Sequence, residues 1–142
     1  MRAWKERGLR PFAAVAAEVV AEVVARPAAD VITYIPPDGD RSVKRGHHPP
    51  RRLARELAAV WELQPRPLLR RTRAVERQAG LALADRRANV RGAFAADVPC
   101  PSRVLLVDDV YTTGATVAAA ASALRRSGAR QVDVVTFARA VR

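Results

Sequence analysis

The sequence predicts an α/β fold with a mostly parallel sheet flanked by helices, and three observations carry this prediction. Apolar, β-branched runs suited to interior strands occur at residues 30–35, 104–107 and 132–137. Helical patterns separate these runs, in the order expected of β-α-β units. The chain has 142 residues, with no internal repeat and no obvious second domain. We therefore expect one domain spanning residues 1–142.

Three helices are expected from apolar spacing and from residues that begin or end a helix. Residues 11–25 show the spacing of an amphipathic helix. Its expected apolar face consists of Phe12, Val15, Val19 and Val23. Residues 50–63 show similar spacing, with Pro50 suited to the first turn. Residues 115–127 form an alanine-rich pattern that Gly128 is placed to end.

The strands are bounded by turn-forming residues. The strand at 30–35 is expected to end at Pro36-Pro37, because proline favours extended backbone before it and cannot continue the ladder. Two shorter segments, 68–73 and 93–94, are further strand candidates. The proline-rich segment 36–50 is a long loop, and long loops in compact domains are often functional. The aromatic residues expected in the core are Trp61 and Phe137.

The most informative stretch runs from Val104 to Thr116. Four apolar residues lead to two adjacent carboxylates, Asp108 and Asp109, and a Thr/Gly loop and a helix follow. The loop N–H groups, the helix dipole and the threonine hydroxyls favour a phosphate at this turn. The carboxylates repel a phosphate, so we expect them to serve sugar hydroxyls or a divalent cation nearby. The pattern therefore predicts a site for a phosphorylated sugar.

Other interpretations of this acidic pair fit the sequence less well. A response-regulator receiver carries its acidic pair near its start and a lysine far downstream, whereas no lysine follows Asp109. A Walker B strand needs a G-x-x-x-x-G-K-[ST] partner, and this sequence has none. An acidic pair that only caps the end of a strand, with no ligand, remains the structural alternative. The Thr/Gly loop that follows argues against it.

The positive charge is large and unevenly distributed. The formal net charge is +11, and residues 41–91 carry 14 Lys/Arg against 4 Asp/Glu, a local net charge of +10. Such a run favours a polyanion, either a pyrophosphate with its ribose phosphate or nucleic acid. A solvated basic face is the alternative. Because no DNA-binding motif is recognisable and aromatic residues are few, nucleic-acid binding is expected to be weak, sequence-independent and salt-dependent.

The remaining composition indicates a cytoplasmic protein that does not enter a membrane. No segment approaches 18 uninterrupted apolar residues. The charged residues 5–7 precede any apolar run, unlike a secretory signal. The single cysteine, Cys100, rules out a disulfide framework within the chain and fits a reducing compartment.

The stretch from Val104 to Thr116 resembles the phosphoribosyl pyrophosphate (PRPP) motif of type I phosphoribosyltransferases. Further segments make most of the chain similar to the ComF (competence protein F) family, which is associated with DNA uptake in naturally competent bacteria. These segments are Lys5–Gly8, Arg45-Gly46, Leu69–Gln78, Arg86–Val90 and Ala93-Phe94. The resemblance implies a Rossmann-like fold with a mostly parallel sheet and a reduced or absent hood.

Two departures from the family pattern stand out. Longer members begin with a cysteine-rich zinc ribbon, which a chain with one cysteine cannot build, so we expect this domain alone. Members usually show an aromatic residue and an Asn after the Arg-Gly, where this chain has His47 and His48. A metal-binding or general-base role for these histidines is conceivable. A substrate-facing or solvent position is the expected alternative.

The resemblance implies a role for each part of the PRPP motif. Asp108 and Asp109 would bind the ribose 2′- and 3′-hydroxyls. The residues expected to hold the 5′-phosphate are Thr112, Thr113, Gly114, Ala115 and Thr116. Mg²⁺ is the expected cofactor, bound through PRPP without a direct protein ligand, although Asp108 or Asp109 could reach it through water.

The resemblance also assigns two loops to the leaving group. The pyrophosphate-binding candidates are Arg41, Lys44, Arg45 and Gly46, in a loop that in the family often contains a cis peptide, which Pro36-Pro37 could supply. The segment 70–91 resembles a flexible loop that closes over the site. Its candidates for reaching pyrophosphate are Arg71, Arg73, Arg77 and Gln78. An exposed basic turn and an ordinary surface loop are the respective alternatives.

The predicted function is a phosphoribosyltransferase that uses PRPP and releases pyrophosphate. The acceptor would be an unidentified nitrogen nucleophile, and its recognition by a hood would have to come from residues 1–29. A homodimer is among the expected partners, as dimers are common in the superfamily. The rival hypothesis is a non-catalytic PRPP-binding regulator, or a DNA-uptake accessory protein with a basic face.

Overall fold

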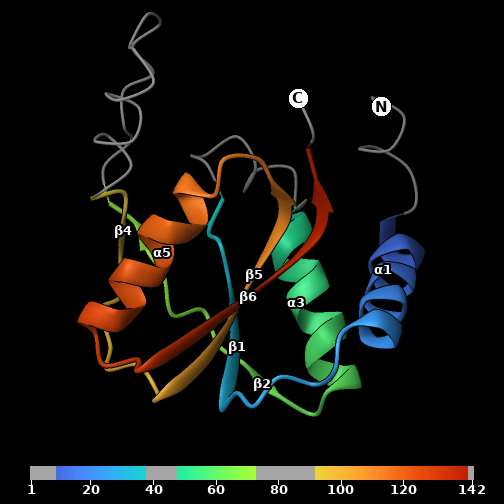
Figure 1. The fold of residues 1–142 in the computed structure, drawn as a ribbon, viewed down its shortest axis with the longest axis horizontal. Helices are drawn as coiled ribbons and strands as arrows, with labels where there is room; N and C mark the ends of the chain where they lie inside the picture. The colour runs from blue at the N-terminus through green and yellow to red at the C-terminus, as the bar shows by residue number, and fades with distance from the viewer. Residues whose placement is uncertain (1–8, 38–47, 73–91, 141–142) are drawn as a thin grey trace, which may run out of the picture.

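The computed structural model describes residues 9–37, 48–72 and 92–140, and it alternates helices with strands (Figure 1). The helices are α1 (Leu9–Val23), α3 (Pro49–Val60) and α5 (Ala115–Arg126). The strands are β1 (Val31–Tyr34), β2 (Gln64–Pro65), β3 (Arg70–Arg71), β4 (Phe94–Ala95), β5 (Arg103–Tyr111) and β6 (Gln131–Arg139). The predicted α/β class is confirmed. The predicted helix ends agree with these bounds to within about three residues.

Four strands form one parallel sheet in the order β2-β1-β5-β6. The register places Tyr34 of β1 beside Val107 of β5, and Asp108 of β5 beside Thr136 of β6. The carboxyl ends of β1 and β5 therefore meet at one edge of the sheet. Ligands bind outside this edge in open α/β sheets, so the topology brings the acidic pair to the expected place.

Helices α1 and α3 cover one face of the sheet. Alternate strand residues point into this core because successive side chains of a strand face opposite sides. The strand residues in it are Ile32, Leu105, Val107 and Val135. Trp61 is buried in this core, and Phe137 packs against it, with its ring 5.4 Å from that of Phe12 in an edge-on contact. Both aromatic predictions are confirmed.

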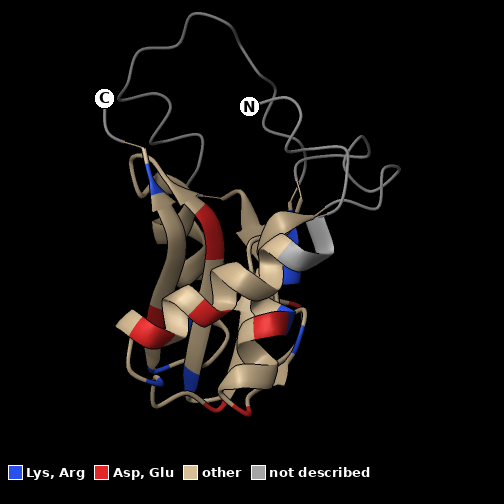
Figure 2. Ribbon diagram, turned by 90° about the vertical axis from the view of Figure 1, so that its right-hand side faces the viewer, with Lys and Arg blue, Asp and Glu red and all other residues tan. Residues whose placement is uncertain are grey.

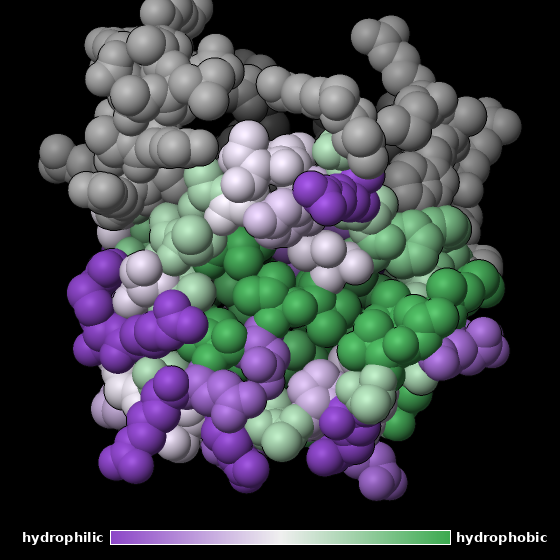
Figure 3. All heavy atoms as spheres, in the orientation of Figure 1, coloured by the Kyte–Doolittle hydropathy of each residue, from purple (hydrophilic) through white to green (hydrophobic). Residues whose placement is uncertain are grey.

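The predicted apolar face of α1 is wrong for its three valines, whereas Phe12 packs against the core as expected. Val15, Val19 and Val23 are 52%, 47% and 78% exposed, and the buried positions are instead Ala16, Ala17 and Val20. Figure 3 shows the exposed hydrophobic side chains across the middle of one face, over β6, and at its edge over α1. The described part of residues 1–29 thus belongs to the helical layer that covers the sheet.

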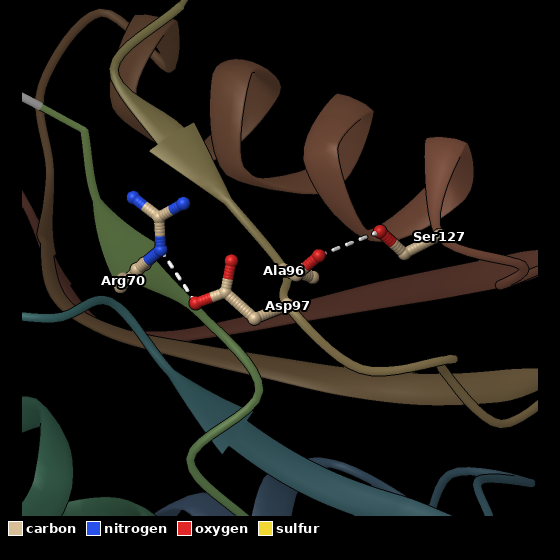
Figure 4. Close-up of polar contacts among 4 residues, drawn as sticks. All are labelled: Arg70, Ala96, Asp97 and Ser127. Carbon is tan, nitrogen blue, oxygen red and sulfur yellow. Dashed lines mark hydrogen bonds and ion pairs between the residues drawn. The ribbon is translucent and has the colours of Figure 1, made fainter.

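Helix α5 and the antiparallel pair β3–β4 cover the opposite face. Arg70 of β3 forms an ion pair with Asp97, and the Ser127 hydroxyl after α5 donates to the Ala96 carbonyl at 3.2 Å (Figure 4). The ion pair joins β3 to the residues after β4, and the hydrogen bond ties those residues to the end of α5. Since β3 and β4 flank residues 73–91, they fix where that segment leaves and rejoins the domain.

Three smaller predictions have clear outcomes. Gly128 follows the last residues of α5 with a φ of +113°, which confirms it as the residue that ends the helix. No peptide bond is cis among the described residues, so Pro36-Pro37 does not supply the cis peptide expected there. No helix in the described ranges is long and apolar enough to cross a membrane.

Candidate functional site

The acidic pair lies within β5 and not after it, because the strand continues to Tyr111 through pairing with β6. Asp108 is only 8% exposed, whereas Asp109 is half-buried. The Asp108 Oδ1 accepts the Asp109 N–H at 2.9 Å, and the Asp109 Oδ1 accepts the Val110 N–H at 2.9 Å. Each carboxylate thus accepts an N–H of its own strand with one oxygen, and the two carboxyl groups also interact with each other. Hydroxyl donors or a hydrated cation would approach the remaining carboxylate oxygens.

Burial raises the pKa of Asp108 to about 6. The Asp109 N–H opposes this shift by donating to the Asp108 carboxylate, while the neighbouring Asp109 charge adds to it and the Arg71 charge reduces it. A carboxylate that is costly to ionise in the empty protein becomes easier to ionise when a cation or hydroxyl donors arrive. This is the behaviour expected of a site prepared for a ligand.

Asp108→Asn is expected to stabilise the empty protein at alkaline pH. The folded-state pKa of Asp108 lies above its ordinary value of 3.8, so the folded protein favours the protonated carboxyl group. The stability that this group contributes is fully present below pH 3.8 and is lost as the pH rises through about 6. At pH 8 the free energy of unfolding of the variant should therefore exceed that of the wild type by up to about 3 kcal/mol. Urea unfolding from pH 4 to pH 8 measures this difference.

The control for this prediction is the pH profile itself. The gain from Asp108→Asn should shrink to a few tenths of a kcal/mol near pH 4, where Asp108 is protonated in the folded wild type and about half protonated in the unfolded chain. Burial lowers the pKa of His48, which reduces stability as the pH falls below 6.5. This effect is common to both proteins and cancels in the difference. A gain that does not change with pH would show that the charge of Asp108 is not its cause.

The Thr/Gly loop after β5 leaves backbone donors open at the start of α5. Gly114 is the N-cap residue with a φ of +76° and makes no side-chain cap bond. The Ala115 N–H reaches the Thr113 hydroxyl oxygen at 3.4 Å, and the Ala118 N–H donates to the Gly114 carbonyl. Among the described residues no acceptor meets the N–H groups of Thr116 and Val117. An uncapped helix start with free N–H groups suits a phosphate.

Tyr111, the last residue of β5, is a residue beside the loop that the sequence analysis did not single out. A Cβ added to Gly114 would lie 2.8 Å from the Tyr111 Cζ and closer still to its hydroxyl oxygen. The tyrosine side chain therefore packs directly on the glycine backbone. Its position three residues before Gly114 was visible in the sequence, but the strand was expected to end at Val107, so neither its place at the end of β5 nor the direction of its side chain was predicted.

Arg71 requires a correction. It was predicted as a residue of a flexible loop, but it lies in β3, with its guanidinium over the Phe94 ring at 4.9 Å. Its Nε donates to the carbonyl oxygens of Pro36 and Pro37, at 3.2 and 3.0 Å. Arg71 therefore joins the small β3–β4 sheet to Pro36 and Pro37, which follow β1. It also lies close enough to the acidic pair for its charge to lower the pKa of Asp108.

His48 is the N-cap residue of α3, where its Nδ1 accepts the Arg51 N–H at 3.0 Å. Its half-buried ring lies 5.5 Å from that of Tyr34, the last residue of β1. The position at which ComF proteins usually carry Asn is thus a capping position, which Asn also suits. Since no group of three or more His, Cys, Asp or Glu residues gathers in the described ranges, His48 has no partners there for a metal site.

The other predicted loop residues lie outside the described residues. For pyrophosphate binding these are Arg41, Lys44, Arg45 and Gly46. For the flexible loop they are Arg73, Arg77 and Gln78. The structure does bring the acidic pair, the Thr/Gly loop, His48 and Arg71 together at the carboxyl edge of the sheet.

Comparison with solved structures identifies the class of fold. Glutamine PRPP amidotransferase from B. subtilis superposes with a TM-score of 0.62 at 26% identity, over 92% of this chain and 27% of that one. Hypoxanthine phosphoribosyl transferase from Trypanosoma cruzi gives a TM-score of 0.52 at 12% identity, over 94% and 74%. The chain therefore has the type I phosphoribosyltransferase fold.

Comparison with curated sequences then identifies relatives of this chain. The chain is 32% identical to competence protein F of Haemophilus influenzae over 105 residues, which are 70% of this chain and 46% of that protein. It is 41% identical to DNA utilization protein YhgH of Escherichia coli O157:H7 over 83 residues, 58% of this chain and 35% of that protein. The chain is a homologue of both, and the ComF resemblance is confirmed. It spans less than half the length of either relative, and no protein-family model matches it.

Proposed function

We propose that this protein binds PRPP at the carboxyl edge of β5 and transfers its phosphoribosyl group. The observation that carries the proposal is one continuous segment, in which the acidic pair of β5, with Asp108 buried and Asp109 half-buried, leads through Gly114 to the open N-terminus of α5. Asp108 and Asp109 would accept hydrogen bonds from the ribose 2′- and 3′-hydroxyls. The N–H groups of Thr116 and Val117 and the hydroxyls of Thr112 and Thr113 would donate to the 5′-phosphate.

Mg²⁺ is the proposed cofactor. Mg²⁺ prefers one or two carboxylates together with phosphate oxygens and water, and two adjacent carboxylates beside a phosphate site match that preference. Asp108 or Asp109 would hold the ion through water, and PRPP would supply the other oxygens. The ion would neutralise charge that gathers on pyrophosphate as it departs.

The proposed reaction breaks the bond between C1 of the ribose and pyrophosphate. A nitrogen nucleophile attacks C1 from the opposite face with inversion, loses a proton, and pyrophosphate leaves with the bonding electron pair. The protein contributes by positioning the ribose and by meeting the charge of the leaving group. No side chain needs to form a covalent bond.

Pyrophosphate release from PRPP tests the transfer. The assay would supply Mg²⁺ and a panel of bases, amines and ammonia, with Asp108→Asn as the inactive comparison. Acceptor-dependent release by the wild type supports a transferase. Tight PRPP binding without release for any acceptor would favour the non-catalytic PRPP-binding regulator.

Arg45→Ala is expected to weaken binding of Mg²⁺-pyrophosphate about tenfold or more and to leave ribose 5-phosphate binding unchanged. The reason is that Arg45 is proposed to meet only the leaving group, and a lost charge-assisted hydrogen bond costs about 1.5–3 kcal/mol. Calorimetry with the two ligands measures the difference.

Arg55→Ala is the matched control, because Arg55 is an exposed arginine on α3 and its removal lowers the net charge equally. It should leave both affinities nearly unchanged. Equal losses for both ligands in Arg45→Ala, or equal losses in the two variants, would point to a general electrostatic effect.

A second candidate function is non-specific nucleic-acid binding. It is favoured by the names of the relatives, competence protein F and DNA utilization protein YhgH, and by exposed arginines of this chain. Basic residues occur on α3 and at the ends of strands (Figure 2). The exposed arginines on described elements include Arg51, Arg55, Arg70, Arg125 and Arg126.

Oligonucleotide binding is expected to be weak, independent of sequence and reduced by orders of magnitude between about 50 and 200 mM salt, because counterion release dominates such binding. PRPP should compete, because the loop arginines Arg41, Arg45, Arg73 and Arg77 are proposed to bind its pyrophosphate group. Fluorescence anisotropy with unrelated labelled oligonucleotides measures both effects. Tight, sequence-selective binding at physiological salt that ignores PRPP would place the DNA-handling function first.

A further inference from the structure

Strand β6 forms an edge of the parallel sheet that no described strand covers. It pairs with β5 on one side, and no other described strand pairs with it. The Gln131 N–H donates to the Ser102 carbonyl at 2.9 Å, and alternate residues of a strand direct their backbone groups to opposite sides. The N–H and C=O groups of Val132, Val134 and Thr136 therefore point away from β5. They form a row of donors and acceptors along the edge.

The two edges of this sheet differ in how they are protected against further pairing. The other edge, β2, is two residues long and contains Pro65, which has no N–H to offer a further strand. Strand β6 is nine residues long and contains no proline or glycine. Its residues from Val134 to Ala138 carry no charge. Short length, proline and charge keep sheet edges from pairing, so β6 lacks the usual protection and can receive another strand.

The exposed valines of α1 lie beside this edge. Val15 and Val19 follow Phe12 by three and seven residues, so they share its side of the helix. The Phe12 ring contacts that of Phe137 on β6. These valines therefore border β6 on the face of the sheet that α1 covers, while Val134 is 39% exposed on the opposite face. Figure 3 shows this hydrophobic surface over β6 and over α1.

The sequence of β6 complements itself when a second copy runs antiparallel to it about Thr136. Such a copy sets Asp133 opposite Arg139, and Val135 opposite Phe137. Opposite charges, and an aromatic residue opposite a β-branched one, are favourable pairs across antiparallel strands. A parallel copy in the same register would instead place Asp133 beside Asp133, which is unfavourable. The charges therefore favour a second copy of this chain, related by a two-fold axis, as the partner of this edge.

We propose that two copies of this chain associate through antiparallel pairing of their β6 strands about Thr136. The pairing joins two four-stranded sheets into one continuous sheet. Asp133 of each copy meets Arg139 of the other. With the two-fold axis perpendicular to the sheet, both α1 helices lie on the same face, where Val15 and Val19 of the two copies cover one another. The proposal goes beyond the proposed function and does not depend on it, because it uses only β6 and α1.

Analytical ultracentrifugation from low to high micromolar concentration measures the association. We expect monomer and dimer without larger species, because a two-fold interface closes on itself. Asp133→Arg should weaken dimerisation about tenfold or more, since it sets arginine opposite arginine at two symmetric positions. Adding Arg139→Asp should restore the dimer with the charges exchanged. A wild type that stays monomeric, or a double variant that does not recover, would overturn the inference, with urea unfolding confirming that each variant is folded.

Val134→Lys tests the edge itself, because a lysine on an edge strand opposes pairing. The side chain is partly exposed in the single copy, so a lysine fits there without unfolding it. We expect this variant to be monomeric at every concentration. Val60→Lys is the matched control, because Val60 is 49% exposed at the end of α3, which packs over β1 and β5, and the change adds the same charge. It should dimerise like the wild type. A dimer that survives Val134→Lys would contradict the proposed interface.

Hydrogen exchange of the wild type locates the interface without any substitution. The backbone N–H groups of Val134 and Thr136 should exchange slowly at high concentration and lose this protection when the protein is diluted. The N–H groups of the odd-numbered residues Asp133 and Val135 point toward β5, so their protection should change little. A dimer in which the amides of Val134 and Thr136 exchange as fast as in the monomer would place the interface elsewhere and refute the proposal.

Discussion

Replacing Asp108 and Asp109 together with Asn is expected to weaken Mg²⁺-PRPP binding by about 100-fold or more while the protein stays folded. Hydrogen bonds to a charged group contribute about 1.5–3 kcal/mol each, and both carboxylates would lose their charge. The Asn side chains keep the shape and an acceptor oxygen for the N–H groups of Asp109 and Val110. Calorimetry with PRPP and Mg²⁺ measures the affinity, and urea unfolding confirms that the fold is retained.

Asp133→Asn is the matched control for the acidic pair. Asp133 lies on β6 beside Leu105, toward the opposite end of the sheet, where it accepts a hydrogen bond from the Gln131 side chain at 2.8 Å. Its replacement removes one carboxylate from the sheet without touching the proposed site, so PRPP affinity should stay at the wild-type value. Unchanged PRPP affinity in the Asp108/Asp109 double variant would remove these residues from the ribose site.

Gly114→Val is expected to abolish measurable binding of ribose 5-phosphate and to destabilise the protein. Gly114 has a φ of +76°, which costs a residue with a side chain about 1–2 kcal/mol. The added side chain would also displace Tyr111, whose ring lies against the glycine. Both effects move the loop that presents the N–H groups of α5. The variant should remain folded at moderate temperature, so its lower stability alone would not explain the loss of phosphate binding.

Gly128→Val separates the two effects. Gly128 has a φ of +113° at the other end of α5, and its added Cβ would meet the Cys100 carbonyl oxygen at 3.3 Å. This variant should lose stability comparably but keep its affinity for ribose 5-phosphate. If both glycine variants lost the ligand equally, the loop at Gly114 would have no special part in phosphate binding.

The parts of the fold that depend on local pattern were predictable. The segment from Val104 to Thr116 carries its own strand, acidic pair, turn and helix start, so these elements and the proposed chemistry were apparent in the sequence, although the strand continues past the acidic pair to Tyr111. Gly128 ended its helix as expected because the left-handed backbone there favours glycine. The mostly parallel sheet followed from apolar strands separated by helical patterns.

The parts that depend on a distant partner were not predictable. Apolar spacing in α1 favoured the valine face, but close packing on α3 selected Ala16, Ala17 and Val20. The position of Arg71 depends on Phe94, more than twenty residues away, and on the carbonyl groups of Pro36 and Pro37. The capping bond of His48 forms within three residues, but its nearness to Asp109 depends on the sheet register.

Calorimetric titration of the wild-type protein with PRPP, in the presence and absence of Mg²⁺, tests the central claim most directly. The account predicts one binding site per chain, tighter with Mg²⁺ than without it, and occupied competitively by ribose 5-phosphate. It also predicts that affinity rises as the pH increases through about 6, where Asp108 loses its proton. Absence of PRPP binding by the folded protein at pH 8 with Mg²⁺ present would contradict the account, whatever the acceptor.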